Sequence, residues 1–286
     1  MIPAQFDYAA PATLDEALAL LSKDPEAKAL AGGHSLLPVM KLRLATPTML
    51  VDLRKIQDLR GISAHNGGWR IGAMTTYAEA AAHRELQRYH ALHDALTVIG
   101  DVQVRNRGTI GGSLAHNDPA ADLPAVALAL EATINARGPG GERAIPIDQF
   151  IVGLFETALS SGEVITSVDL PALAANTGSA YAKFANPASG YALVGVAARL
   201  TLANGVAQNV RVAVTGAASH ASRLSEVERA LEGQQLSDEA IAQAAEQAGQ
   251  NLDYNSDIHA SADYRRAMVK VYTRRALTRA LERARG

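Results

Sequence analysis

Two short glycine-rich stretches constrain this sequence more than any other feature. They read Ala-Gly-Gly-His-Ser at residues 31–35 and Thr-Ile-Gly-Gly-Ser at residues 109–113. A glycine pair allows a turn with positive φ, and without a Cβ its amides can approach an anion closely. The hydroxyls of Ser35, Thr109 and Ser113 add further donors. Together the two stretches predict a cradle for the diphosphate of a cofactor.

Neither stretch matches a common phosphate-binding fingerprint. No Gly-Lys-Ser/Thr follows either glycine pair, as a Walker loop requires, and neither pair fits the Gly-x-Gly-x-x-Gly pattern of a Rossmann unit. Each pair alone is first of all a turn signal, so ordinary turn glycines remain the alternative. We therefore expect the cradle to belong to a different fold.

The composition excludes several classes of function. The 286 residues are 48% hydrophobic with a formal net charge of −2, which allows two or three compact domains and gives no case for nucleic acid as a partner. Without any cysteine, the chain cannot hold disulfides, thiolate nucleophiles or iron–sulfur clusters. No signal peptide is expected from the first residues, and no apolar stretch reaches about 18 residues. We therefore expect a cytoplasmic protein without membrane insertion.

Hydrophobic periodicity and capping residues predict short strands and helices throughout. Thr13 with Glu16, and Thr76 with Glu79, form capping boxes that open helices. A boundary is expected near residues 171–178, followed by an antiparallel sheet packed by helices. In that last part, strands are expected at residues 180–184, 192–202 and 210–215, and helices at residues 224–232, 237–248 and 262–284.

Four segments, taken in order, resemble the FAD-binding medium subunit of molybdenum hydroxylases, including the medium subunit of carbon monoxide dehydrogenase and the FAD domain of xanthine dehydrogenase. They read AGGHSLLP at residues 31–38, MKLRLATP at 40–47, TIGGS at 109–113 and DPAADLP at 118–124. The resemblance extends over nearly the whole chain.

The resemblance implies an α+β fold. An FAD-binding domain of the vanillyl-alcohol-oxidase type would consist of two subdomains, residues 1–56 and 57–175. An α+β C-terminal domain with a three-stranded antiparallel sheet and helices would follow at residues 178–286.

The resemblance also implies a role in electron transfer. In this family a large subunit carries the molybdenum cofactor, a small subunit carries 2Fe–2S clusters, and the FAD of the medium subunit passes the electrons to an external acceptor. The chain would be the flavoprotein subunit of an oxidoreductase, in a heterotrimer or a doubled heterohexamer, with no catalytic residue for substrate and no metal site of its own. Carbon monoxide, a purine, nicotine or another N-heterocycle, and an aldehyde all remain open as substrates.

Fourteen residues are expected to bind FAD without a covalent bond. They are Ala31, Gly32, Gly33, His34, Ser35, Thr109, Ile110, Gly111, Gly112, Ser113, Asp122, Ile165, Lys183 and Tyr191. Replacing either Gly32 or Gly111 by valine is expected to remove FAD with little effect on the fold.

Four of these residues also have an ordinary structural explanation. Asp122 is expected at the ribityl or ribose hydroxyls, or as a simple helix cap. Ile165 would pack near the flavin or adenine, or only in the core. Lys183 would lie near the isoalloxazine, or be an exposed strand lysine. Tyr191 would lie over the flavin ring, or be an aromatic residue between domains.

Two other interpretations stay open. A free-standing flavin oxidase or dehydrogenase could share this fold, and a scaffold that has lost its flavin could keep it. The last helix, at residues 262–284, is rich in arginine. We expect it to present a solvated basic face, with a docking surface as the alternative.

Overall fold

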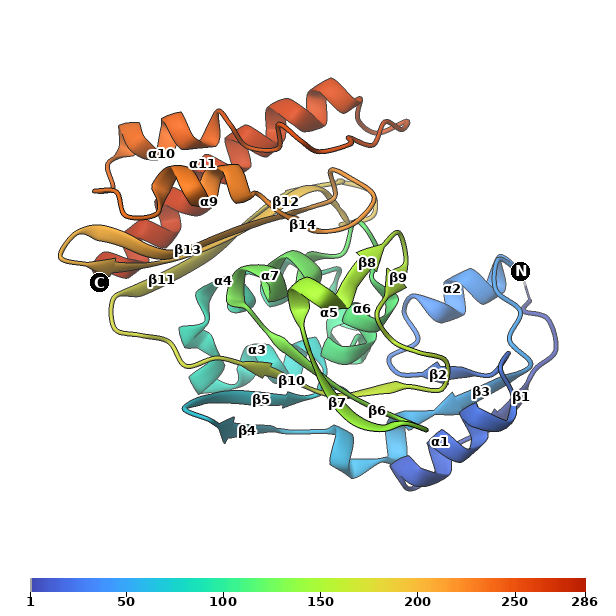
Figure 1. Ribbon diagram of the computed structural model, residues 1–286. Helices are drawn as coiled ribbons and strands as arrows, with labels where there is room; N and C mark the ends of the chain where they lie inside the picture. The colour runs from blue at the N-terminus through green and yellow to red at the C-terminus, as the bar shows by residue number, and fades with distance from the viewer. Residues whose placement is uncertain (1) are drawn as a thin grey trace.

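The strands of the described residues form three larger sheets and one two-stranded hairpin, and the first sheet comes from the N-terminal segment. The computed structural model describes residues 2–286. Two helices connect three parallel strands in the spatial order β1-β3-β2 (Figure 1). The elements are β1 (Asp7–Ala9), α1 (Leu14–Lys23), β2 (Lys28–Leu30), α2 (Leu36–Lys41) and β3 (Met49–Asp52). The three-residue strand β1 was not predicted, because it is too short to show any alternation.

The second sheet is antiparallel, in the order β4-β5-β10-β6-β7. Helices lie between this sheet and the C-terminal part of the chain (Figure 1). The strands are β4 (Ile62–His65), β5 (Gly68–Gly72), β6 (Thr133–Gly138), β7 (Gly141–Pro146) and β10 (Val164–Leu170). The helices are α3 (Tyr77–Ala82), α4 (His90–Val98), α5 (Val102–Arg107), α6 (Ile110–His116), α7 (Asp122–Leu130) and α8 (Ile147–Phe150), and a small hairpin pairs β8 (Ile151–Gly153) with β9 (Glu156–Thr157).

Local sequence signals placed several of these elements correctly. Thr13 caps α1 by accepting a hydrogen bond from the Glu16 amide. Thr76 and Glu79 form the complete capping box of α3. These signals depend on contacts within one turn of chain, so the local sequence alone can reveal them.

The third sheet forms the C-terminal part, residues 177–286, and is antiparallel throughout. Its strands are β11 (Thr177–Ala185), β12 (Ala192–Ala203), β13 (Val206–Thr215) and β14 (Ser222–Arg223), so a fourth, two-residue strand joins the three predicted ones. The predicted helices correspond to α9 (Ser225–Leu231), α10 (Asp238–Ala245) and α11 (Ala262–Arg285). Helices α9–α11 cover one face of the sheet, and α4 and α7 cover the other (Figure 1).

Strand β12 is buried on both faces. Val194, Val196 and Leu200 belong to the core of the C-terminal part, whereas Ala197 belongs to the core of the N-terminal part. Small side chains on this second face, Ala197 and Ala213, let α7 approach the sheet closely. This double burial explains the continuous apolar run of residues 192–198.

Ion pairs between the N-terminal and C-terminal parts all have the same orientation of charge. In residues 2–286, every such pair has its acid in the N-terminal part and its base in the C-terminal part. Asp94 pairs with Arg279 and Arg283, and Asp122 pairs with Lys183. Glu131 pairs with Arg199 and Arg211, and Asp148 pairs with Arg223. We call these residues the charged interface.

The charged interface corrects the expected role of the last helix. Arg283 of α11 donates to Asp94 at 2.7 Å, and Arg279 does so at 3.0 Å. Arg265 is 3% exposed and donates to two backbone carbonyls, those of Leu193 and Gly216. The expectation of a solvated basic face is therefore wrong for Arg265, Arg279 and Arg283, whereas Arg266, Arg274, Arg275 and Arg285 are exposed.

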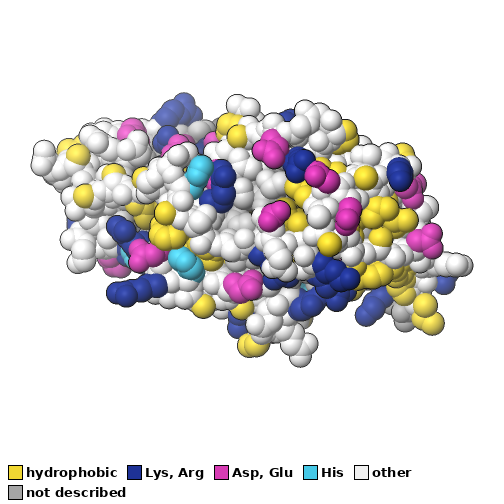
Figure 2. Space-filling model, turned by 90° about the horizontal axis from the view of Figure 1, so that it is seen from below, with side chains coloured by type: hydrophobic (Ala, Val, Ile, Leu, Met, Phe, Trp, Pro, Cys, Tyr) yellow, Lys and Arg dark blue, Asp and Glu magenta, His cyan; other side chains and the backbone are white. Residues whose placement is uncertain are grey.

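The face opposite the C-terminal helices is mixed in charge. Figure 2 shows acidic and basic side chains interspersed over it, without a continuous band of either sign. Within residues 2–286, no helix combines the length and the apolar character that crossing a bilayer requires.

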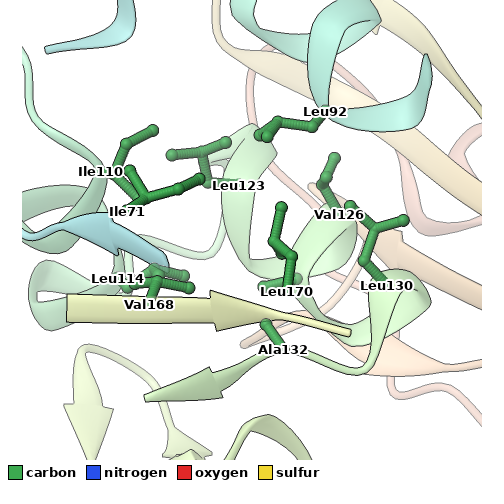
Figure 3. A pocket seen from close by; sticks show the side chains of 11 residues that line it. Ile71, Leu92, Ile110, Leu114, Leu123, Val126, Leu130, Ala132, Val168 and Leu170 are labelled. Carbon is green, nitrogen blue, oxygen red and sulfur yellow. The ribbon is translucent and has the colours of Figure 1, made fainter. Parts of the chain in front are cut away.

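A small apolar cavity of about 20 Å³ lies between α6, α7 and the second sheet. The side chains around it are all hydrocarbon, and Leu114 and Ile110 of α6 point into it with Val168 and Leu170 of β10 (Figure 3). A space of this size is little larger than one water molecule, so it is a packing defect and not a cofactor site.

Removing one of these side chains should destabilise the fold measurably. Leu114 is 1% exposed, so Leu114→Ala would enlarge the cavity and lower the free energy of unfolding by about 3 kcal/mol in urea titrations. Leu44 is 76% exposed, and Leu44→Ala should change it by less than about 0.5 kcal/mol. Equal effects of the two substitutions would contradict this account of the core.

Acid should weaken the charged interface at Glu131. Burial acts to raise the pKa of Glu131, but Arg199 and Arg211 outweigh it and hold the pKa below its ordinary value of 4.5. A group whose pKa is lowered by folding stabilises the folded state above its unfolded pKa and loses that effect as the pH falls through the folded pKa.

The Glu131→Gln substitution isolates this contribution. In urea unfolding the wild type should be more stable than the variant at about pH 7, and the difference should shrink as the pH falls below about 4.5. A difference that stays constant across this range would show that the carboxylate charge does not matter.

Candidate cofactor site

The first glycine stretch is a loop between β2 and α2. Gly33 has a φ of +77°, which a residue with a side chain rarely adopts. The amides of Gly32, Gly33, His34 and Ser35 donate no hydrogen bond to any atom in residues 2–286, and the Ser35 hydroxyl does not cap α2. Backbone N–H groups need an acceptor, so this loop offers four consecutive donors to a ligand or to water.

The second glycine stretch differs from its prediction. Residues 110–113 form the first turn of α6, and neither Gly111 nor Gly112 has a positive φ. Their amides are already used inside the protein: Gly111 donates to the Ala73 carbonyl at 2.9 Å, and Gly112 donates to the Thr109 hydroxyl at 3.1 Å. The expected turn with exposed amides is therefore wrong here.

Lack of space explains why these two residues are glycines. A Cβ on Gly111 would lie 2.5 Å from the Ala73 Cβ, and one on Gly112 would lie 2.6 Å from the Thr109 hydroxyl oxygen. Helix α6 can start this close to β5 and to its own cap only without side chains at these positions. The ligand donors left on this stretch are its hydroxyls, above all that of Ser113.

The two glycine stretches lie against each other. A Cβ on Gly32 would lie only 2.1 Å from the carbonyl oxygen of Arg107 and 2.9 Å from the Cα of Gly108. A Cβ on Gly112 would approach the Ala31 Cβ to 3.3 Å. The sequence argument for one cradle built from both stretches is thus consistent with the fold.

Asp122 is the first residue of α7, and its carboxylate does not cap that helix. It accepts hydrogen bonds from the Tyr181 hydroxyl at 2.5 Å and from the Lys183 ammonium at 2.9 Å. Both side chains of the Asp122–Lys183 pair are almost fully buried. Burial raises the pKa of Asp122, whereas Lys183 and Tyr181 oppose that rise. Lys183 is therefore not the exposed strand lysine of the alternative explanation.

Tyr191 connects the loop to this pair. It lies between β11 and β12 and is 44% exposed. Burial is the largest of the causes that raise the pKa of the Tyr191 phenol, and the charges of Asp118 and Asp122 raise that pKa further. The nearby Ser35 hydroxyl lowers it. Tyr191 thus lies close to the first glycine stretch and to Asp122 at once.

Ile165 and His34 have less distinctive surroundings. Ile165 is 4% exposed in β10, next to Thr166, whose carbonyl accepts from the Ala73 amide. Strand β10 therefore positions Ala73, whose carbonyl accepts the hydrogen bond from the Gly111 amide. The His34 ring is exposed, and its Nδ1 lies 3.2 Å from the Gly32 carbonyl of its own loop. In residues 2–286, no group of three acidic or histidine side chains is placed to hold a metal ion.

Sequence reasoning missed two tyrosines of this region. The Tyr181 hydroxyl contacts Asp122 directly, and Tyr77 lies close enough to Asp122, Tyr191 and Ser113 for all three to affect its pKa. Burial raises the pKa of Tyr77 to about 12, with Ser113 opposing. Tyr181 could have been found, since residues two apart on a strand share a face and Lys183 was already a candidate.

A polar pocket of about 380 Å³ adjoins Tyr191 between the N-terminal and C-terminal parts. It is lined by Asp118, Pro119, Ala120, Asn186, Ser189, Tyr191, Ala192, Leu193, Gly216, Asn255, Asp257, His259 and Arg265. Its volume lies in the range of small-molecule sites, so Tyr191 faces a space that admits more than water.

These residues fit a cofactor with a diphosphate, hydroxyl groups and a planar ring. Free amides suit the anion, a fixed carboxylate suits hydroxyl donors, and a partly exposed tyrosine suits a ring face. Among the site residues of the described part of the chain, the structure places no nucleophile beside a general base.

Comparisons with known proteins show which chains this one resembles. Residues 4–173 match the family described as the FAD binding domain in molybdopterin dehydrogenase, and residues 179–280 match the CO dehydrogenase flavoprotein C-terminal domain. The carbon monoxide dehydrogenase medium chain of Hydrogenophaga pseudoflava is 40% identical over 99% of both chains. The 6-hydroxypseudooxynicotine dehydrogenase complex subunit alpha of Paenarthrobacter nicotinovorans is 38% identical over 100% of this chain and 97% of its own.

A solved structure is similar over the same length. The carbon monoxide dehydrogenase of Hydrogenophaga pseudoflava, in a form lacking the Mo-pyranopterin moiety of its molybdenum cofactor, matches with a TM-score of 0.96 and 41% identity over 99% of both chains. The likeness thus includes the arrangement of the N-terminal and C-terminal parts.

The glycine contacts correct the expectation for substitutions in the cradle. A side chain on Gly32 would collide with backbone atoms, so Gly32→Ala should destabilise the ligand-free chain by about 2 kcal/mol in urea unfolding as well as weaken cofactor binding. Gly140 has no atom within 4 Å of its would-be Cβ and no positive φ, so Gly140→Ala should affect neither property. A Gly32→Ala chain as stable as the wild type would contradict the observed backbone contact.

Proposed function

The chain belongs to the FAD-binding medium subunits of the molybdenum hydroxylases, and we propose that the two glycine stretches, Asp122, Lys183 and Tyr191 hold its FAD. When bound, FAD supplies the one- and two-electron chemistry, and the protein sets its position and surroundings. The chain is thus the flavoprotein subunit of an oxidoreductase, and it carries electrons without oxidising substrate itself.

One observation supports the diphosphate position above all others. The amides of Gly32, Gly33, His34 and Ser35 have no acceptor within residues 2–286, and they follow one another along a loop that touches the second stretch. Consecutive free amides in a concave loop are a typical anion site. We propose that the first stretch gives the amide donors, and that Thr109 and Ser113 give hydroxyl donors from the second.

The Asp122–Lys183 pair is proposed to serve the ribityl or ring portion of FAD. Asp122 would accept hydrogen bonds from hydroxyl groups, using lone pairs that Tyr181 and Lys183 leave free. Lys183 would lie near the isoalloxazine. Because its ammonium donates to Asp122 at 2.9 Å, its charge is partly neutralised, and we expect a smaller effect on the flavin than a free lysine would have.

Two further FAD contacts remain proposals. Tyr191 would cover a face of the flavin ring, since it lies near both Ser35 and Asp122. Ile165 would contribute mainly through its backbone, because its side chain is in the core.

Electrons must enter from partner subunits. The chain has no cysteine for iron–sulfur ligation, so the clusters belong to another chain. Its relatives are medium chains of multi-subunit molybdenum enzymes, and we propose partnership with a large molybdopterin subunit and a small iron–sulfur subunit in a cytoplasmic heterohexamer. Residues 1–56 and 57–175 would be the FAD-binding subdomains, and residues 178–286 the domain that completes the site.

Purification with the native partners tests this proposal. The complex should contain FAD, iron and molybdenum together, and its electron transfer to an external acceptor should stop when FAD is removed and return when FAD is added back. The isolated chain should bind FAD but leave it oxidised when offered candidate substrates. Reduction of that flavin by a substrate in the absence of partners would instead support a free-standing flavin enzyme.

A further inference from the structure

A fully buried tyrosine lies behind the Asp122–Lys183 pair. Tyr181 is 2% exposed, and its hydroxyl is 2.5 Å from one carboxylate oxygen of Asp122 while Lys183 takes the other. Tyr181 and Lys183 are two residues apart on β11, so both project from the same face of the strand toward the start of α7. Asp122 is therefore held at both oxygens by a single strand.

The backbone of Tyr181 is fixed as firmly as its hydroxyl. Its amide donates to Asp94 at 3.0 Å, and its carbonyl accepts from Arg279 at 3.0 Å. Asp94 and Arg279 also pair with each other as part of the charged interface. The position of the phenol is thus set by contacts from both parts of the chain.

Gly195 makes room for this phenol. A Cβ at that position would lie 2.1 Å from the Tyr181 hydroxyl oxygen. Gly195 sits inside β12, where glycine weakens a strand unless something must approach closely. The atom that approaches most closely is the hydroxyl oxygen that binds Asp122, and the Thr215 side chain, 2.9 Å from the same Cβ position, also requires a glycine there.

We propose that Tyr181 is a positioning residue for FAD binding: through its hydroxyl it orients the Asp122 carboxylate, so that Asp122 can receive the hydroxyl groups of the cofactor. This inference rests on the proposed function, because it assumes that FAD occupies the site. Tyr181 itself, buried behind Asp122, acts without touching the cofactor.

A pH profile separates this role from a merely structural one. Tyr181→Phe keeps the ring and removes the hydroxyl, and loss of a donor to the charged form raises the pKa of a carboxyl group. In the full chain freed of flavin, FAD should bind about tenfold more weakly, and the weakening should grow as the pH is lowered. The wild type should lose affinity only at lower pH.

Tyr89→Phe is the matched control. Tyr89 is 3% exposed and donates to the Pro171 carbonyl at 2.7 Å, away from the site. It should lower the melting temperature to a similar degree as Tyr181→Phe and leave FAD affinity unchanged at every pH. If the two variants bind FAD equally well, the proposed role of Tyr181 is wrong.

A double-mutant cycle tests whether Tyr181 affects FAD binding through Asp122. If Tyr181 acts through Asp122, then Tyr181→Phe should change FAD affinity by less than about twofold in an Asp122→Asn background. A tenfold loss in both backgrounds would overturn the inference. If Tyr181→Phe does not fold, Gly195→Ala decides, because it displaces the hydroxyl without removing it. Wild-type affinity and pH profile in Gly195→Ala would then reject the inference.

The outcomes also separate this inference from the proposed function. A wild-type chain that takes up no FAD would reject the function as a whole. A wild type that binds FAD, together with a folded Tyr181→Phe variant that binds it equally at every pH, would reject only the role of Tyr181.

Discussion

The contact between the backbone at Gly32 and the backbone at Arg107 and Gly108 is the constraint on which the site depends. These two segments lie far apart in the sequence, and they can approach this closely only because Gly32 has no Cβ. The contact brings a loop with four free amides next to a helix start that carries hydroxyls. The two stretches are not equivalent. The first offers free backbone amides, whereas the glycine amides of the second are hydrogen-bonded within the protein and hold the start of α6 in place.

The C-terminal part completes the site from the other side. Lys183, Tyr181 and Tyr191 all come from or follow β11, and they face Asp122 and Ser35 of the N-terminal part. Apolar packing of Ala197 and Ala213 sets the distance between the parts, and the charged interface sets their register. Binding of FAD and docking of the two parts therefore draw on the same residues, which makes the cofactor site a property of the whole chain.

Sequence reasoning succeeded where the deciding interaction is local. The helix caps at Thr13 and Thr76 depend on residues within one turn, and the structure has both, with the reciprocal bond of the capping box complete at Thr76, whereas Glu16 accepts from Ala12 and not from Thr13. It failed where the partner is distant. The amide of Gly111 donates to the Ala73 carbonyl, and Arg279 and Arg283 of α11 pair with Asp94; a periodicity argument can predict neither contact. The family resemblance identified Lys183 as a candidate site residue, but only the fold shows that Asp122 partly neutralises the charge of Lys183.

The one-sided sorting of acids and bases has a consequence for how the chain holds together. Because every cross-pair joins a carboxylate from the first part to a cation from the second, the surfaces that meet attract each other and each would repel a copy of itself. The linker at residues 171–176 joins the two parts, but the opposite charges on their surfaces are what make the two parts recognise each other. The charges of the interface therefore favour docking of the two parts on each other over association of either part with a copy of itself.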